Sequence, residues 1–131
     1  MPGVKPPERS TAGSAGYDFY LPADITLLPG DARQVDSGVR AYMKNDEVLQ
    51  LHIRSSLGKR MVNLTNCTGI IDSDYFGTGN SIKIMLVNRG KRIVNLRRGD
   101  KIMQGIFTKY LVTDNDEVTS KRSGGIGSTG R

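Results

Sequence analysis

Short runs in which large apolar residues alternate with polar ones recur along this chain, and turn-forming residues separate them. The pattern is clearest at 47–53 and 81–88, where leucine or isoleucine occupies every second position over most of the run. A period of two residues is typical of a strand with one buried face. Further strand candidates of similar length lie at 18–21, 25–28, 32–35, 39–43 and 92–96.

The segment 102–112 is ambiguous, because its apolar residues fit a helical stripe as well as they fit a strand. Gly105 and the aromatic residues that follow it closely favour a strand. Strands this short, with turn residues at such regular intervals, predict an all-β sandwich or a jelly-roll-like barrel.

The chain has 131 residues, which suffice for one domain with one modest core. We expect the β domain to cover residues 1–112. The stretch 113–120 is polar and acidic and predicts a linker, whereas 121–131 is rich in glycine, hydroxyls and cations. Residues 113–131 are therefore predicted to form a linker followed by a mobile C-terminal arm.

Composition excludes several kinds of site. With one cysteine, Cys67, and one histidine, His52, the chain has no disulfide framework, no cysteine-based zinc site and no two-histidine mechanism. We expect Cys67 to be a packing residue rather than a nucleophile. No apolar run approaches the roughly 20 residues that a membrane span needs, so we expect no membrane partner and a cytoplasmic location.

The net charge of +6, from 19 lysines and arginines against 13 aspartates and glutamates, suits an anionic partner. The cations are spread along the chain, there is no tryptophan, and aromatic residues are few. A base-stacking surface for single strands is therefore poorly supported, and no nucleic-acid partner is expected. Charge favours phosphate binding without identifying the phosphate.

Several polar positions have residue types that suit phosphate chemistry. The stretch 54–56, Arg-Ser-Ser, directly follows a strand candidate and can present a guanidinium and hydroxyls to a phosphate. Asp18 follows a glycine turn, where it can hold a hydrated cation or merely cap the turn. Gln104 follows the Gly-Asp turn of 98–101 and could bind a ligand. Alone, each is equally well explained as an ordinary strand-to-turn junction.

The segment 69–77 contains two carboxylates and a tyrosine between glycines. A carboxylate at the end of an apolar strand can orient and deprotonate a water molecule. If the segment is extended, Asp72 and Asp74 share one face and Tyr75 lies on the other. For an isolated Asp-Ser-Asp, a polar hairpin turn is the simpler explanation.

Taken together, five segments resemble the five motifs of the trimeric dUTPase family, in the family's order: 15–18, 54–56, 69–77, 98–104 and 124–130. Each is weak alone, but five in order across 12–131 make the resemblance specific. It implies a distorted jelly-roll barrel and a homotrimer with active sites at subunit interfaces. It also implies hydrolysis of dUTP to dUMP and pyrophosphate, with Mg²⁺ on the triphosphate.

The resemblance further implies roles for single residues. Asp72 matches the acid that activates water for attack at the α-phosphorus, and Asp18 matches a residue that reaches magnesium only through water. Asn66 matches a uracil-contacting hairpin residue, and Tyr75 one that lies against the deoxyribose. Contacts with the nucleotide are implied for Arg54, Ser55, Ser56, Asn66, Gly69, Ile71, Tyr75, Gln104, Arg122, Ile126, Gly127, Ser128 and Thr129.

The C-terminal motif departs from the usual family pattern, in which the arm closes over the site as a lid. Ile126 stands where most of the family has a phenylalanine that stacks on the uracil, so apolar cover is kept and aromatic stacking is lost. The spacing leaves Lys121 and Arg122 as candidates for the motif's cation. Arg122 is preferred, because its planar fork suits phosphate oxygens better.

Two other functions fit parts of the pattern. The dCTP deaminases share the fold and an Arg-Ser-Ser stretch, but deamination needs a carboxylate three residues before a terminal strand asparagine. Asn88 matches that asparagine and Met85 occupies the carboxylate position, so deamination is disfavoured. A regulatory protein that keeps the nucleotide site as a switch is the alternative from a different class.

Overall fold

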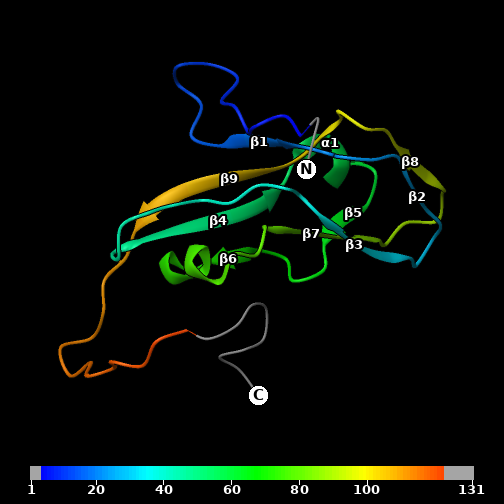
Figure 1. Ribbon diagram of the computed structural model, residues 1–131. Coiled ribbons are helices and arrows are strands. Elements are labelled where there is room, and N and C mark those ends of the chain that lie inside the picture. Colours follow the sequence, from blue (N-terminus) through cyan, green and yellow to red (C-terminus); the bar gives the residue numbers. More distant parts are fainter. Residues whose placement is uncertain (1–3, 123–131) are drawn as a thin grey trace.

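The computed structural model describes residues 4–122, which form an all-β domain of nine strands with two short helical turns (Figure 1). One sheet contains, in order, β1 (Tyr17–Tyr20), β9 (Lys101–Lys109), β4 (Glu47–Ile53) and β6 (Gly69–Ile71). The other two sheets are β2 (Ile25–Leu27) with β8 (Val94–Leu96), and β3 (Ala32–Asp36), β7 (Lys83–Asn88) and β5 (Val62–Leu64) in that order. The helical turns are α1 (Ser55–Gly58) and η1 (Ser73–Thr78). The predicted all-β class is confirmed.

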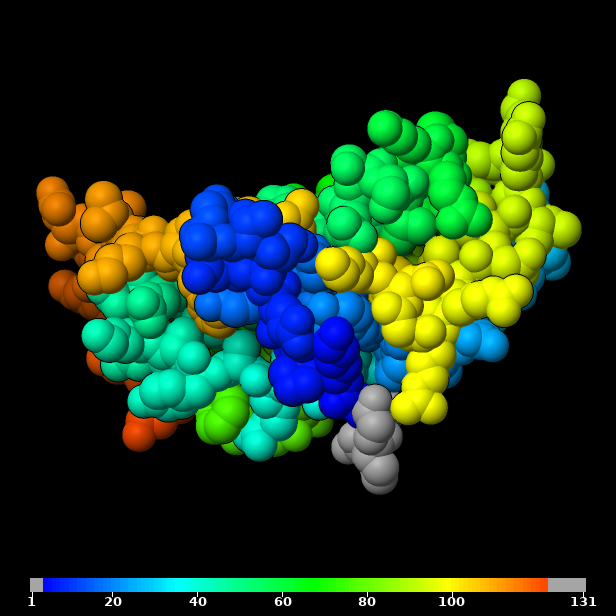
Figure 2. Space-filling model, turned by 90° about the horizontal axis from the view of Figure 1, so that it is seen from above, coloured from blue at the N-terminus to red at the C-terminus, as the bar shows by residue number. Residues whose placement is uncertain are grey.

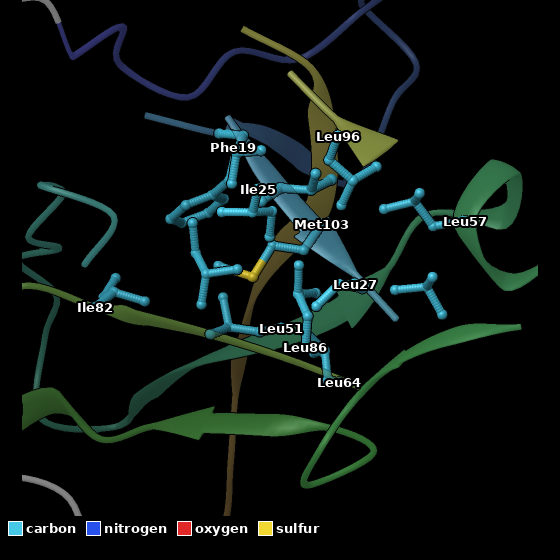
Figure 3. Packing of buried hydrophobic residues seen from close by; sticks show 14 of the residues in the cluster. Phe19, Ile25, Leu27, Leu51, Leu57, Leu64, Ile82, Leu86, Leu96 and Met103 are labelled. Carbon is cyan, nitrogen blue, oxygen red and sulfur yellow. The ribbon is translucent and has the colours of Figure 1, made fainter. Parts of the chain in front are cut away.

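Aliphatic side chains from all three sheets share one core, in which Leu51, Leu86 and Met103 lie together (Figure 3). On β7, Ile84 and Leu86 are fully buried, whereas Met85 between them is only partly buried. Burial of one such aliphatic side chain contributes about 1.5–3 kcal/mol. The alternation in the sequence is therefore the alternation of core and outer face in the structure.

The strand predictions at 18–21, 25–28, 32–35, 47–53 and 81–88 are confirmed with small shifts of their ends. The segment 102–112 is a strand as predicted, although it begins at Lys101 and ends at Lys109. The strand predicted at 39–43 is wrong. The carbonyl of Val39 accepts one hydrogen bond from the Ile82 N–H, but 39–43 pairs with no strand.

Two strands were missed, β5 and β6. Each has only three residues, which is too short for a period of two to be recognised. They lie in different sheets, because β5 pairs with β7 and β6 pairs with β4. The loop 65–68 therefore crosses from one sheet to another, and the hairpin expected around Asn66 is not a two-stranded hairpin.

Strand β4 sets the distance between Arg54, which follows one of its ends, and the segment after β6, which pairs along one of its edges. At one end, His52 and Ile53 pair with Gln104 and Met103 on β9, and Arg54 follows directly. On its other edge, β4 pairs with β6 through Leu49 to Leu51. No helix among residues 4–122 is both long and apolar enough to span a membrane.

Candidate functional site

The predicted site residues within the described range gather around two pockets. The first, called the β1 pocket here, has a volume of about 280 Å³. It is lined by Ser10, Ser14, Ala15, Gly16, Asp18, Arg54, Ser55 and Gln104. The N-terminal segment and α1 lie on the face seen in Figure 2, in dark blue and green. The sequence motifs at 15–18, 54–56 and 98–104 therefore converge in one subunit.

Asp18 is the buried charge of the β1 pocket, with a side chain only 9% exposed. Its carboxylate faces Arg54 Nε at 3.4 Å and Lys101 Nζ at 3.8 Å, and it accepts a hydrogen bond from Ser10 Oγ at 3.0 Å. A buried carboxylate needs such partners, because an unpaired charge away from water is costly. Asp18 therefore holds the Arg54 side chain beside the pocket.

Gly16 and Gln104 are in close contact in the β1 pocket. The register pairs Asp18 with Gln104 across β1 and β9, so the Gln104 side chain extends toward the glycine turn. A Cβ atom on residue 16 would collide with the side-chain oxygen of Gln104. Glycine is thus required here for the close approach of backbone to side chain. Ser56, in α1, is exposed beside this group but does not line the pocket.

The second pocket, called the β6 pocket here, has a volume of about 180 Å³. It contains the predicted residues Asn66, Gly69, Ile71, Asp72, Tyr75 and Arg122. The other lining residues are Leu51, Leu64, Ile70, Lys83 and Met85. A Cβ on residue 69 would lie 2.9 Å from Leu51 Cδ1, so glycine lets β6 pack closely against β4.

The third motif does not continue as an extended strand. Asp72 has an extended backbone at the N-terminus of η1, and Asp74 and Tyr75 lie within that 3₁₀ helix. The segment is not extended, so the condition under which strand alternation would place Asp72 and Asp74 on one face is not met. The turn buries the Tyr75 ring, and the Tyr75 hydroxyl donates to the Ser81 carbonyl at 3.0 Å.

Arg122 binds both carboxylates of this motif. Its Nε donates to Asp74 Oδ1 at 2.7 Å and its Nη2 donates to Asp72 Oδ2 at 2.5 Å. The Arg122 side chain is 9% exposed, whereas those of Asp72 and Asp74 are 53% and 55% exposed. The hydrogen bond to Asp74 raises the pKa of Arg122, so the guanidinium stays charged.

The loop 65–68 forms the rim of the β6 pocket beside Asn66. Cys67 is exposed and has a positive φ of 65°, a conformation that an L-residue seldom adopts. The expectation that Cys67 is a packing residue is wrong, because the loop turns its side chain outward between two sheets. Asn66 itself is exposed and lines the pocket.

Among the pocket residues to which the sequence gave no binding role, Lys83 and Met85 lie on β7. The sequence did indicate their position, because the alternation along β7 places both side chains on the face opposite the core. Lys83 forms an ion pair with Asp36 on the neighbouring β3, and the hydrogen bond from Lys83 lowers the pKa of the Asp36 carboxyl. Lys83 is thereby held at the edge of the pocket.

Asp72 from the β6 pocket and Arg54 from the β1 pocket lie toward opposite ends of β4. Continuing the β4–β6 register by one residue sets Asp72 opposite Val48, whereas Arg54 follows the far end of the same strand. Six residues of strand separate those positions, which corresponds to about 20 Å. In Figure 1, β1 and α1 lie above β4, and β6 lies below it. Ile126, Gly127, Ser128 and Thr129 lie outside the described residues.

Comparison with known proteins agrees with this arrangement. The sequence model of the dUTPase family matches residues 4–130. Over 134 residues, the chain is 37% identical to the deoxyuridine 5'-triphosphate nucleotidohydrolase of Lactococcus lactis subsp. lactis (strain IL1403), covering 98% of this chain and 89% of that protein. The dUTPase of Streptococcus mutans superposes with a TM-score of 0.77 at 34% identity, covering 83% of this chain and 88% of the other.

A more distant structure shows how widely the fold is kept. A mutant of the dUTPase from Staphylococcus aureus phage phi11, whose structure contains a structural Mg(II) ion, has a TM-score of 0.78 at 18% identity, covering 94% of this chain and 95% of the other. The predicted jelly-roll-type β fold is confirmed by these neighbours. With its motifs in order and its fold shared over most of its length, this chain belongs to the dUTPase family, the enzymes that hydrolyse dUTP to dUMP.

Proposed function

We propose that the protein is a homotrimer that cleaves dUTP to dUMP and pyrophosphate in active sites shared between subunits. The observation that carries the shared site is the separation of Asp72 and Arg54, one from each pocket. Asp72 has to reach water beside the α-phosphorus, and Arg54 has to hold the phosphates of the same nucleotide. About 20 Å of β4 separates these two residues in one subunit. A second subunit must therefore supply one of the two.

The pocket volumes support the same conclusion. The β1 pocket has about 280 Å³ and the β6 pocket about 180 Å³. Pockets that enclose a whole ligand usually have about 300–1,000 Å³. Each pocket thus suits a part of a nucleotide, the β1 pocket the charged phosphates and the β6 pocket the base and sugar. Juxtaposition of the two at an interface between subunits would make one complete site.

Asp72 is the proposed general base. It accepts a proton from water as the water oxygen bonds to the α-phosphorus, and the bond from that phosphorus to the oxygen bridging to the β-phosphate breaks. Pyrophosphate leaves with the electrons of that bond, and dUMP remains. The position of Asp72 supports this role, because its carboxylate lines the pocket and is half exposed to the entering water.

Arg54, Ser55, Ser56 and Gln104 are the proposed phosphate-binding residues. The Arg54 fork suits phosphate oxygens, and its ion pair with Asp18 fixes it beside the pocket before substrate arrives. Preorganised cations and donors stabilise the charge that develops on the transferring phosphoryl group. Asp18 thus positions the Arg54 guanidinium, even though Asp18 itself need not touch the nucleotide.

The chemistry of the site fits a magnesium ion carried by the triphosphate. No group of three or more histidine, cysteine, aspartate or glutamate side chains among the described residues could hold a metal by itself. Asp18 is the one carboxylate lining the β1 pocket, which suits contact through water rather than an all-protein cage. When bound, magnesium would offset phosphate charge and hold the triphosphate in one conformation.

The β6 pocket is the proposed base and sugar site. Tyr75 presents a buried ring whose hydroxyl is already bonded to Ser81, so the ring can exclude a 2′-hydroxyl without offering it a partner. Asn66, Gly69 and Ile71 would contact the uracil, whose donors and acceptors differ from those of cytosine. A pocket whose groups match the donors and acceptors of uracil would leave polar groups unpaired with cytosine, and would therefore reject it.

The arm of 113–131 is the proposed lid. Arg122, Ser128 and Thr129 would bind the γ end of the triphosphate, and Ile126 and Gly127 would cover the base. Arg122 already lines the β6 pocket in the described structure, which supports its place in the lid. Lys121, the other candidate cation, is exposed and lines neither pocket.

Deamination of dCTP has less support. That chemistry needs a carboxylate at position 85, and Met85 presents a thioether to the β6 pocket instead. A regulatory role that depends on nucleotide binding is compatible with the same two pockets. A regulatory protein would be recognised by dUTP binding without hydrolysis.

The test is pyrophosphate release with magnesium from the deoxyuridine, deoxythymidine, deoxycytidine and uridine triphosphates, measured in parallel. Rapid release from dUTP alone is expected. Release from uridine triphosphate at a comparable rate would contradict the role of Tyr75. Tight dUTP binding without release would contradict hydrolysis and favour the regulatory protein.

A further inference from the structure

A third pocket, called the basic pocket here, lies between two loops and takes no part in the site described above. It is lined by residues 59–61, which follow α1, and by residues 90–94, which lead into β8, and its volume is about 520 Å³. It shares no lining residue with the β1 pocket or the β6 pocket. In Figure 2 the two loops lie next to each other, in green and yellow-green. A pocket of this size has room for several side chains of a partner.

Four cations line the basic pocket, two from each loop: Lys59, Arg60, Lys91 and Arg92. All four are exposed, and within residues 4–122 none of them forms an ion pair or a side-chain hydrogen bond. The flanking sequence supplies no local partner, because residues 48–71 and 75–99 contain no aspartate or glutamate. The fold thus gathers cations that are spread along the chain, and their positive potentials add at this pocket.

Backbone hydrogen bonds hold the two loops together. The fully buried Asn88 side chain donates to the Arg92 carbonyl at 2.8 Å and accepts from the Gly90 N–H at 2.9 Å. The Arg89 N–H donates to the Met61 carbonyl at 2.9 Å, which ties one loop to the other. The backbone therefore keeps the four cations close, and an anionic group between them would offset their mutual repulsion.

Met61 and Ile93 add apolar surface to the same pocket, one from each loop. Met61 is 52% exposed and Ile93 is 57% exposed. Met61 also has a φ of 63°, in the left-handed region that costs free energy for any residue with a Cβ. A strained backbone that presents an exposed thioether does not stabilise the domain by itself. It is explained if the side chain packs against a partner, and methionine adapts well to such contacts.

The combination of cations and apolar side chains distinguishes between anionic partners. Phosphate, or the backbone of a nucleic acid, would use the cations and leave Met61 and Ile93 in water. None of the eight described residues that line the pocket is aromatic, so it offers no surface on which a base could stack. A peptide segment with both acidic and apolar residues would use the cations and the apolar surface together.

We propose that the basic pocket is a docking site for an acidic segment of a partner protein. Carboxylates of the segment pair with the four cations, and an apolar side chain of the segment packs between Met61 and Ile93. Opposite charges also attract at long range, so the cations raise the rate at which the segment associates. The pocket contains none of the residues proposed to bind or hydrolyse dUTP, so the inference does not depend on the proposed function.

The first experiment measures binding of labelled peptides to the full-length protein by fluorescence anisotropy. The probe is a fluorescein-labelled peptide of the sequence Asp-Glu-Leu-Asp-Glu-Leu-Asp-Glu. One control peptide replaces the leucines by serine, and another replaces the acidic residues by asparagine and glutamine. Each control should bind about tenfold more weakly than the probe, because each lacks one kind of contact. Binding of the probe should also weaken as salt is raised.

Three outcomes of this experiment would overturn the proposal. The probe could fail to bind, which would show that the pocket does not recognise acidic segments. The serine peptide could bind as tightly as the probe, which would remove the apolar contact. A labelled short DNA duplex, measured in parallel, could bind more tightly than the probe, which would make the pocket a site for phosphate backbones.

The second experiment locates the binding on the protein. The double variant Lys91→Glu with Arg92→Glu should lower affinity for the probe about tenfold or more. The double variant Arg33→Glu with Lys44→Glu makes the same change in net charge at exposed residues outside the basic pocket, and it should bind the probe almost as the wild type does. Equal losses in the two double variants would show that net charge alone attracts the peptide, and the proposal would be wrong.

A third variant separates docking from folding. Met61→Gly removes the side chain and places glycine where φ is positive, so Tm should stay within a few degrees of the wild-type value. Affinity for the probe should nevertheless fall about tenfold. Wild-type affinity of Met61→Gly would contradict the packing between Met61 and Ile93. Pyrophosphate release from dUTP should be unchanged in all these variants, and absence of release in the wild type would refute hydrolysis without affecting the docking result.

Discussion

The two pockets differ in how their residues are held. In the β1 pocket, Asp18 and Gln104 are directly paired across β1 and β9, and Asp18 fixes Arg54 by an ion pair. In the β6 pocket, Asp72 follows a three-residue strand, and its partner Arg122 comes from the arm beyond the last strand. One pocket is built by sheet pairing, and the other by a loop, a 3₁₀ turn and an arm.

The difference shows where preorganisation is needed. Binding of phosphate charge benefits from cations that are already in place, because reorientation during the reaction costs free energy. A base and sugar site has to admit and release a bulkier group, which suits segments held by fewer contacts. The division predicts that changes at the β6 pocket affect turnover and closure, whereas changes at the β1 pocket affect phosphate binding.

The largest effect is expected from Asp72→Asn. Loss of the base should lower turnover by roughly 100- to 10,000-fold, while dUTP binding persists, since the amide keeps the shape of the side chain. Pyrophosphate release and calorimetric binding of dUTP measure the two quantities. Asp46→Asn, an exposed aspartate outside both pockets and outside the proposed lid, is the matched control. Near wild-type turnover of Asp72→Asn would remove Asp72 from the mechanism.

The separation of the pockets is tested by mixing inactive subunits. Asp72→Asn and Arg54→Ala each damage one pocket, so either oligomer alone should be nearly inactive. In an equal random mixture, about one quarter of interfaces combine an intact β6 pocket with an intact β1 pocket. Activity should rise to about that fraction of wild type. Mixtures as inactive as the parents would place both pockets in the same site of one subunit.

A smaller effect is expected from Gly16→Ala, which probes the β1 pocket. The new methyl group would press on the Gln104 side chain, so Gln104 has to move away from its position in the proposed phosphate site. We expect KM for dUTP to rise about tenfold with little change in kcat, as for loss of one charge-assisted contact. Gly13→Ala is the control, because a Cβ there meets nothing within 4 Å. A fall in kcat with unchanged KM would contradict the division between the pockets.

The smallest effect is expected from Tyr75→Phe. The hydroxyl donates to the Ser81 carbonyl, so its loss should lower the free energy of unfolding by about 1 kcal/mol and Tm by a few degrees. The ring remains, so preference for dUTP over uridine triphosphate should be kept. Thermal unfolding measures the loss of stability, and the ratio of kcat/KM for dUTP to kcat/KM for uridine triphosphate measures the sugar selectivity. A loss of sugar selectivity would show that the hydroxyl, and not the ring, excludes the ribonucleotide.

The sequence predicted the β1 pocket better than the β6 pocket, for a physical reason. Alternation defines β4, Gly105 and the aromatic residues after it indicate β9, and the Arg54 and Gln104 positions follow from where those strands start and end. The turn of η1 and the three-residue β6 depend on contacts with distant parts of the chain. Local pattern contains no signal for such contacts, which is why the 3₁₀ turn was missed.

The pairing of Arg122 with Asp74 shows the same limit. Both residues belong to recognised motifs, but 48 positions separate them and no periodicity relates them. Lys83 is the opposite case, because alternation placed it on the outer face of β7 and only its function was missing. The longer strands were readable from the sequence, whereas the three-residue strands and the grouping of side chains required the three-dimensional arrangement.

The position of Cys67 offers a practical route to watching this enzyme work. It is the one thiol of the chain, it is exposed, and it is next to Asn66 without lining the β6 pocket itself. A maleimide fluorophore would therefore attach at a single defined place on each subunit, with no cysteine to remove first. Its emission would report nucleotide entry and departure in real time, from a dye at the rim of the proposed base and sugar site.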